Sequence, residues 1–247
     1  MDRMIYTAMS GAQAALAQQA VTANNLANVG TTAYKAQTTA FRVAPVVGPG
    51  LPTRAYAVET TIGADITPGA IRLTGRDLDV AVAGAGFIAV QARDGSEAYT
   101  RNGSLSIDAD GQLQTHAGLP VIGEGGPITI PPDTTVTIGR DGTISAVTGG
   151  QSLANVTVLG RLKLVSFANG DVLRGGDGLF RAKDGNPVDA DPAISVVGGS
   201  LEDSNVNSVQ AMVDMIAIAR QFEMNIKLLQ SADQNAQRAT QLLAAGQ

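Results

Sequence analysis

Apolar side chains repeat with helical spacing only at the two ends of the chain. Steps of three and four residues, or their sum, connect the N-terminal series Ile5, Met9, Ala12, Leu16, Ala23 and Leu26. The C-terminal series, built in the same way, consists of Met212, Met215, Ala219, Phe222, Ile226, Leu229, Ala236 and Leu243. This is the spacing of a coiled-coil seam. We therefore expect two helices, within residues 1–28 and 205–244, that pair with each other or with neighbouring copies.

The N-terminal helix has a weak apolar stripe, because two of its six seam positions, Ala12 and Ala23, are alanine. Alanine buries little area, whereas a fully buried leucine contributes roughly 1.5–3 kcal/mol. A helix of this length with so little to bury is marginal by itself. We expect it to be ordered only within an assembly; the alternative is an ordinary helix docked on the surface of its own chain.

The residues between the helices have a different pattern. Residues 36–70 contain scattered Pro and Gly with no clear period, which predicts an extended linker with short β segments. Residues 71–199 consist of short alternating runs separated by Asp-Gly and Asn-Gly pairs, which tolerate the positive φ of tight hairpins. Closely spaced short strands of this kind predict an all-β barrel or sandwich-like domain.

The predicted fold class is therefore α+β, mainly β, with coiled-coil-forming terminal helices that flank an all-β domain. The expected divisions are an N-terminal helical segment over 1–35, a linker over 36–70, a β domain over 71–199 and a C-terminal helical segment over 200–247.

Composition narrows the possible functions. The 247 residues are 44 % hydrophobic, but only 4 % are aromatic and Trp is absent, so the core should be aliphatic. The net charge of −5 argues against a nucleic-acid partner, which requires a basic face. The absence of Cys excludes disulfides and thiolate metal sites. No apolar stretch reaches the roughly 18 residues of a membrane span, so no integral membrane insertion is expected.

No residue pattern predicts catalysis, a cofactor or a metal ion. His116 is the single histidine, and no Gly-x-Ser-x-Gly elbow accompanies it. The glycine-rich stretch 84–87 is followed by strand residues rather than by the helix that a phosphate loop requires. The acidic stretches 108–110 and 184–191 lack the terminal Glu of an EF-hand and are expected to be hairpin turns.

Several stretches resemble the rod and hook proteins of the bacterial flagellum. They are Asn24–Asn28 with Thr31–Lys35, a central run from Leu78–Val80 through Tyr99–Gly103 to Gly118–Val121, and Leu201–Asn207 followed by Met212, Met215, Arg220, Phe222 and Asn225. The opening Met1–Gly11, together with Ala219–Met224, is similar to proximal rod members rather than to the longer distal rod or hook proteins.

The resemblance implies a structural subunit of the basal-body rod, located in the periplasm. Such proteins pass unfolded through the flagellar type III export apparatus without a cleaved signal peptide. They then assemble helically with copies of themselves and with other rod proteins. The terminal helices form an inner tube around the export channel, and the β domain lies outside it. Helical assembly needs different contact surfaces on one subunit.

Two alternatives remain open at this stage. The chain could be a distal rod or hook homologue, which its position in isolated basal bodies would decide. It could also be a secreted β-fold wall hydrolase, which requires clustered carboxylates in a cleft and measurable muralytic activity.

The candidate functional residues are those expected at an assembly interface. Asparagines lie where the helices meet irregular segments, and they either bond to neighbouring subunits or cap helix ends within one subunit. The full set is Ile5, Met9, Leu16, Asn24, Asn25, Leu26, Asn28, Ser204, Asn205, Val206, Asn207, Met212, Met215, Phe222, Ile226 and Leu229.

Overall fold

The chain divides into two compact units in a computed structural model that describes residues 2–45, 55–148, 156–167 and 171–244. The helical unit comprises Met1–Val29, Gln37–Gly63 and Val206–Gln247, and the β unit comprises Gly30–Ala36 and Ala64–Asn205. Residues 30–35 and 200–205, which we expected with the helices, therefore belong to the β unit. Most of the expected linker belongs to the helical unit.

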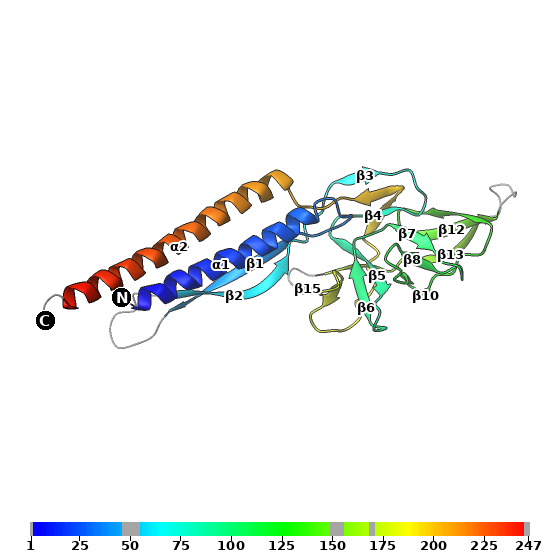
Figure 1. The fold of residues 1–247 in the computed structure, drawn as a ribbon. Coiled ribbons are helices and arrows are strands. Elements are labelled where there is room, and N and C mark those ends of the chain that lie inside the picture. Colours follow the sequence, from blue (N-terminus) through cyan, green and yellow to red (C-terminus); the bar gives the residue numbers. More distant parts are fainter. Residues whose placement is uncertain (1, 46–54, 149–155, 168–170, 245–247) are drawn as a thin grey trace. The chain divides into compact units, whose positions relative to one another are not determined.

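The helical unit contains the two predicted helices, α1 (Asp2–Ala27) and α2 (Ser208–Ala244). They pack side by side and run in opposite directions (Figure 1). Asn207 caps α2, because its side-chain oxygen accepts hydrogen bonds from the backbone N–H groups of Val209 and Gln210 at 3.0 and 3.1 Å. Neither helix, in the part of the chain described, is long and apolar enough to cross a membrane.

A two-stranded sheet formed by β1 (Gln37–Pro45) and β2 (Ala55–Ala64) completes the helical unit. These strands are longer than the short β segments expected there. The sequence did not indicate the full length of these strands, because β1 is half-buried by its contact with α1, a segment distant from most of it in the sequence. Strand alternation is therefore visible in burial, from Gln37 to Arg42, rather than in the polarity of the side chains.

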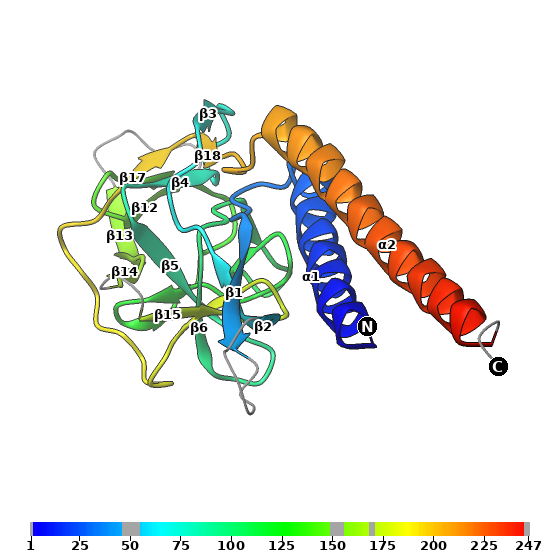
Figure 2. The ribbon, with the colours of Figure 1, turned by 90° about the vertical axis from the view of Figure 1, so that its left-hand side faces the viewer.

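The β unit is built from short strands in several small sheets, and every pairing described within it is antiparallel. The largest sheet has the order β14-β5-β6-β16-β15, and a three-stranded sheet has the order β11-β12-β13. Figure 2 shows β3, β4, β17 and β18 gathered at one edge of this unit. The strands are β3 (Ile71–Leu73), β4 (Val80–Ala83), β5 (Gly86–Gln91), β6 (Glu97–Thr100), β7 (Leu105–Ile107), β8 (Leu113–Thr115), β9 (Ile122–Gly123), β10 (Gly126–Pro127), β11 (Thr134–Ile138), β12 (Thr143–Thr148), β13 (Val156–Arg161), β14 (Leu164–Ser166), β15 (Val172–Arg174), β16 (Phe180–Ala182), β17 (Ser195–Gly198) and β18 (Ser200–Glu202).

The β unit has an aliphatic main core, as its composition predicts, and a second cluster that is aromatic. The main cluster consists of Val, Ile, Leu and Ala side chains from most of the strands. In the second cluster, the Phe87 ring lies 5.3 Å from that of Phe167 and 5.1 Å from that of Phe180, between centroids. Four of the nine aromatic residues of the chain, Phe87, Tyr99, Phe167 and Phe180, are gathered in this cluster.

The turn chemistry predicted from the Asp-Gly pairs is confirmed. The glycines of all five pairs, at positions 95, 111, 142, 178 and 185, have φ between 73° and 83°. Asn102-Gly103 differs, because Gly103 is not among the positive-φ glycines. It is required for space instead: a Cβ on Gly103 would lie 1.8 Å from the carbonyl oxygen of Val80. The Asn169-Gly170 pair lies outside the described residues.

Replacement of Gly103 by Ala should destabilise the β unit by about 1–3 kcal/mol, the usual cost of forcing an extra group into a packed site. The matched control is Gly125→Ala, where a Cβ meets no atom within 4 Å and no positive φ is involved. It should change stability by less than about 0.5 kcal/mol. Urea unfolding followed by near-UV circular dichroism measures both, and equal effects of the two substitutions would contradict the steric explanation.

Acid should weaken the β unit through its turn aspartates. Hydrogen bonds from Ser96, Thr143 and Asn186 lower the pKa values of Asp94, Asp141 and Asp184 respectively. A carboxyl group whose pKa is lower in the folded state adds stability above its unfolded pKa, and that stability is lost as the pH falls through the folded value.

The free energy of unfolding should therefore fall as the pH drops below about 4, near the ordinary pKa of Asp. In the triple variant D94N/D141N/D184N, this fall should be smaller, because an asparagine oxygen still accepts the turn bonds but does not titrate. Urea unfolding at pH 7 and pH 3 gives the comparison. An unchanged pH dependence in the variant would exclude these three groups as its source.

Candidate assembly surfaces and a buried charge cluster

Helix α1 has three faces, each of which repeats every three or four residues. The face toward α2 is formed by small residues at its centre, where Ala12 and Ala15 are 6 % and 2 % exposed. A second face lies against the β1–β2 sheet. There the Ser10 hydroxyl accepts a hydrogen bond from the backbone N–H of Ala57 at 3.1 Å, and the Asn25 side chain exchanges two hydrogen bonds with the backbone of Gln37.

The third face of α1 is exposed from Tyr6 to Ala27. It consists of Tyr6, Met9, Gln13, Leu16, Ala20, Ala23 and Ala27, which we call the outer stripe. Tyr6 and Leu16 are each 50 % exposed, and Met9 is 43 % exposed. No charged residue occurs between Arg3 and Lys35. An exposed helix face with large apolar side chains and no charge is typical of a surface that another chain covers.

Helix α2 has one seam toward α1 and a divided outer side. Ala211, Ile218 and Ala232 are buried at the seam. On the opposite side, the first two turns expose Val209, Met212, Val213 and Ile216, each by more than half. Further along, the outer side of α2 is mixed: Arg220, Glu223 and Lys227 occur there together with the exposed apolar residues Met224 and Leu228. Among the residues of α2 whose exposure is described, the seam positions are Ser208, Ala211, Met215, Ile218, Phe222, Asn225, Leu229, Ala232 and Ala236.

The predicted seam residues are divided between these surfaces. Ile5, Leu26, Met215, Phe222 and Leu229 lie on the α1–α2 seam and are half-buried, and Ile226 is half-buried beside it. Met9, Leu16 and Met212 point outward instead. The seam of α1 is displaced by one residue from part of the predicted series because the helices approach over small alanines, which leaves the larger side chains outside.

The asparagine side chains bond within the chain. Asn28 closes the last turn of α1 with a side-chain hydrogen bond to the carbonyl of Asn24 at 2.9 Å. Asn205 donates to the carbonyls of Asp65 and Thr67 and accepts from the N–H of Ala36, all inside the β unit. All of these bonds lie within one subunit: Asn28 caps a helix end, whereas Asn205 links segments of the β unit. The intersubunit role stays a prediction. Ser204 and Val206, on either side of Asn205, are half-buried.

A buried charge cluster lies next to these asparagine bonds in the β unit. Glu202 is held between two cations: one carboxylate oxygen lies 2.5 Å from Lys35 Nζ, and the other lies 2.7 Å from Arg101 Nε. All three residues are 1 % exposed. Arg101 also donates to the carbonyls of Gly86 and Val82, at 2.8 and 3.2 Å. We call Lys35, Arg101 and Glu202 the clasp.

Lys35 carries a particular electrostatic cost in the clasp. Burial lowers its pKa, the bond and charge of Glu202 oppose that fall, and the neighbouring charge of Arg101 adds to it. One carboxylate therefore has to stabilise two buried cations, helped by the Thr67 carbonyl, which accepts from Lys35 Nζ at 2.7 Å. Removal of one partner from a buried ion pair leaves an uncompensated charge and is strongly destabilising.

The clasp joins three segments that are distant in the sequence. Residues 30–36, 64–70 and 200–205 are connected by backbone hydrogen bonds as well as by the charged side chains. The N–H of Ala33 donates to the carbonyl of Glu202 at 2.8 Å, and the N–H of Asp203 donates to that of Ala70 at 2.8 Å. These are the segments through which the chain enters and leaves the β unit.

Sequence reasoning missed the clasp, although both of its ends lie in the stretches that resemble rod proteins. Lys35 ends the first of these stretches and Glu202 is the second residue of the last. The only local indication was that a charged residue lies close to each group of asparagines: Lys35 follows Asn24–Asn28, and Glu202 precedes Asn205. Because 167 positions separate Lys35 from Glu202, nothing local indicated that they meet.

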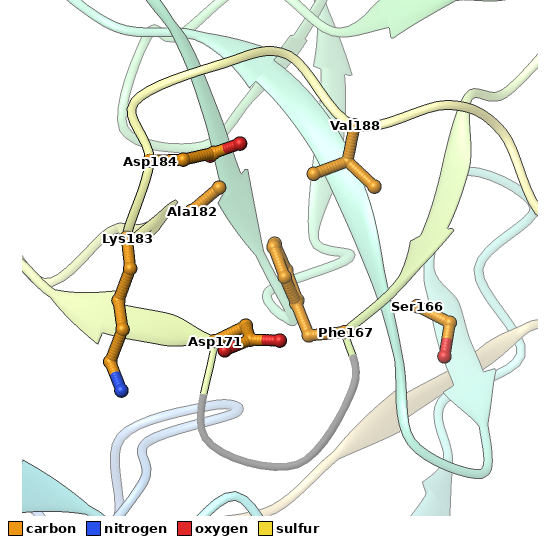
Figure 3. A pocket seen from close by; sticks show the side chains of 7 residues that line it. All are labelled: Ser166, Phe167, Asp171, Ala182, Lys183, Asp184 and Val188. Atoms are coloured by element: carbon orange, nitrogen blue, oxygen red, sulfur yellow. The ribbon is translucent and has the colours of Figure 1, made fainter.

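A surface hollow of about 380 Å³ in the β unit is the place where clustered carboxylates could suggest an enzyme. Figure 3 shows the Phe167 ring standing in it, with the Lys183 ammonium group pointing away from Asp171 and Asp184. The Asp184 carboxylate is already bonded to the backbone and side chain of Asn186. Among the described residues, no three His, Cys, Asp or Glu side chains are placed to hold a metal ion.

Comparisons with known proteins agree with this geometry. Residues 5–35 match the flagella basal body rod protein family, 81–146 the D1 domain of the flagellar hook proteins FlgE/F/G, and 197–242 the C-terminal region of the flagellar basal body rod proteins FlgEFG. The flagellar basal-body rod protein FlgF of Escherichia coli K12 is 52 % identical over 250 residues, which cover 99 % of each chain.

The chain belongs to the flagellar basal-body rod protein family. FlgF of Salmonella typhimurium is 51 % identical over 99 % of each chain. FlgG of Agrobacterium fabrum is 36 % identical over 95 % of this chain and 97 % of that relative. The similarity therefore extends over both units and includes the terminal helices.

The matched regions of the rod family each contribute one residue to the clasp. Lys35 is the last residue of the N-terminal match, Arg101 lies inside the central match and Glu202 lies inside the C-terminal match. The clasp is therefore the place in the β unit where the three regions recognised as separate family segments are bonded together.

Replacement of Glu202 by Gln should lower the free energy of unfolding of the β unit by about 3–5 kcal/mol, because Lys35 and Arg101 would lose their shared counter-charge. Asp203→Asn is the matched control. Asp203 pairs with Arg72 at 3.2 Å, but their side chains are 42 % and 58 % exposed, so its loss should cost about 0–1 kcal/mol. Urea unfolding measures both; a loss for Glu202→Gln no larger than the control would show that the clasp does not stabilise the fold.

Proposed function

We propose that this chain is a structural subunit of the proximal rod of the bacterial flagellar basal body, with no enzymatic role. It assembles helically with copies of itself and with other rod proteins through its terminal helices. These helices line the export channel of the axial drive shaft. The relatives named FlgF and the three family matches support the rod assignment. The location is the periplasmic rod, reached through the flagellar export apparatus without a cleaved signal.

The observation that carries the proposal is the outer stripe of α1. Helix α1 already contacts α2 on one face and the β1–β2 sheet on another, so a third covered face requires another chain. The stripe repeats along the helix from Tyr6 to Ala27 and carries no charge. A surface used only to face water would normally contain charged residues, as the outer side of α2 does beyond Ile216.

The first two turns of α2 provide a second exposed apolar surface on the same unit. A helical assembly joins unlike surfaces of neighbouring subunits, because an identical surface pair would close a two-fold dimer. The outer stripe and the Val209–Ile216 patch differ in length and in side-chain size, so they meet this requirement. The candidate residues Met9, Leu16 and Met212 lie on these two surfaces rather than on the intrachain seam.

Substitution Leu16→Glu should abolish motility without unfolding the subunit. Leu16 is half-exposed, so a carboxylate there is solvated in the free chain but buried where another helix covers it. The variant should match the wild type in circular dichroism and thermal midpoint, yet be missing from isolated basal bodies of a strain that carries only this copy.

Leu16→Met is the matched control and should preserve motility, because it keeps an apolar side chain of similar volume at the same position. Normal swarming and normal incorporation of the Leu16→Glu variant would rule out burial of the outer stripe in the assembled rod.

A further inference from the structure

Asn225 is a polar residue in the seam between α1 and α2. Its neighbours on the seam are Ile218, Phe222, Leu229 and Ala232, all apolar. An asparagine at such a position stabilises a helix pair less than an apolar residue does, and it favours one register over the others. Its presence in an otherwise apolar part of the seam therefore needs a specific partner on α1.

Gly11 supplies that partner. A Cβ on Gly11 would lie 3.2 Å from Asn225 Oδ1, 3.3 Å from Nδ2 and 3.4 Å from Cγ. The Asn225 amide therefore lies against the bare backbone of α1, where even a methyl group would be crowded. Glycine destabilises a helix interior relative to alanine. The close approach of Asn225 explains why Gly11 nevertheless occurs in α1.

Other registers of the same two helices do not reproduce this contact. The helices run in opposite directions (Figure 1), so a shift of one heptad would bring Ile218 or Ala232 to the level of Gly11. The Asn225 amide would then lie level with Met4 or Gln18, neither of which is a glycine. At the centre of α1, the seam positions Ala12 and Ala15 distinguish registers poorly because they are alike.

We propose that the Gly11–Asn225 contact selects the register of the α1–α2 pair and directs α1 to the α2 of its own chain. The two residues are specificity determinants: together they disfavour shifted pairing and pairing with a second copy. The inference concerns one chain and does not depend on the rod assignment. It also favours the docked alternative for α1 over a helix that is ordered only within an assembly.

The absence of Cys from the chain allows two labels to report the register directly. Ala23→Cys and Ser231→Cys place nitroxide labels at exposed positions on α1 and α2 of the full chain, about 27 Å apart along the helix axes, so a change of register alters the distance between them. The distance between the labels is measured by pulsed electron paramagnetic resonance, diluted with unlabelled protein. A shift of one heptad moves a label by about 10 Å along the helix axis, at 1.5 Å per residue.

In this labelled background, the wild type should give a single distance. Asn225→Leu should add a second population whose distance differs from the wild-type one by several ångström, or concentration-dependent association in sedimentation. Asn235→Leu, the same change at an exposed position of α2, should behave as the wild type. A single wild-type distance and a monomer in Asn225→Leu would overturn the proposal, as would a broad distribution in the wild type.

Gly11→Ala tests the contact without removal of the amide. The added methyl group enters the space occupied by Asn225, so a second population should again appear. Retention of the single wild-type distance, with a raised thermal midpoint from better helix propensity, would also overturn the proposal.

Discussion

The β unit depends on one carboxylate placed between two buried cations. Lys35, Arg101 and Glu202 are each nearly inaccessible to water, so none of them can be left without its partner at low cost. They come from residues close to the first entry of the chain into this unit, from its middle and from its end. The β unit is therefore complete only when its first segment, residues 30–36, has joined its last, residues 200–205. Its stability depends on Lys35 and Arg101 as well as on the residues of the strands.

Small residues are the corresponding constraint in the helical unit. Ala12, Ala15 and Gly11 let α2 approach α1 closely, and the β1–β2 sheet occupies a second face of α1. Small side chains bury little apolar area per residue. The geometry of the α1–α2 pair is therefore determined more by steric complementarity than by the amount of apolar surface buried. The large side chains Tyr6, Met9 and Leu16 are left on the outer stripe, where they add nothing to the intrachain contact.

The sequence allowed correct prediction of features that depend on neighbouring residues. Helix positions and the positive φ of the Asp-Gly turns both follow from local chemistry. Features that depend on distant partners were missed. The length of β1 reflects its packing on α1, and the Lys35–Glu202 pair spans 167 positions. The seam of α1 was predicted only in part. Its periodicity was visible in the sequence, but Met9 and Leu16 were assigned to the contact with α2, where the smaller Ala12 and Ala15 are buried instead.

That displacement connects the two constraints. A seam of leucines would have buried more area within one chain and would have held α1 to α2 without help from elsewhere. If those large apolar side chains were used in the seam, the outer stripe would have fewer of them for contact with another subunit. The observed division places a close, register-dependent contact inside the chain and the larger apolar side chains outside it. Under the proposed assembly, intrachain pairing and contacts between subunits therefore use different residues of α1, so a substitution can alter one contact and leave the other intact.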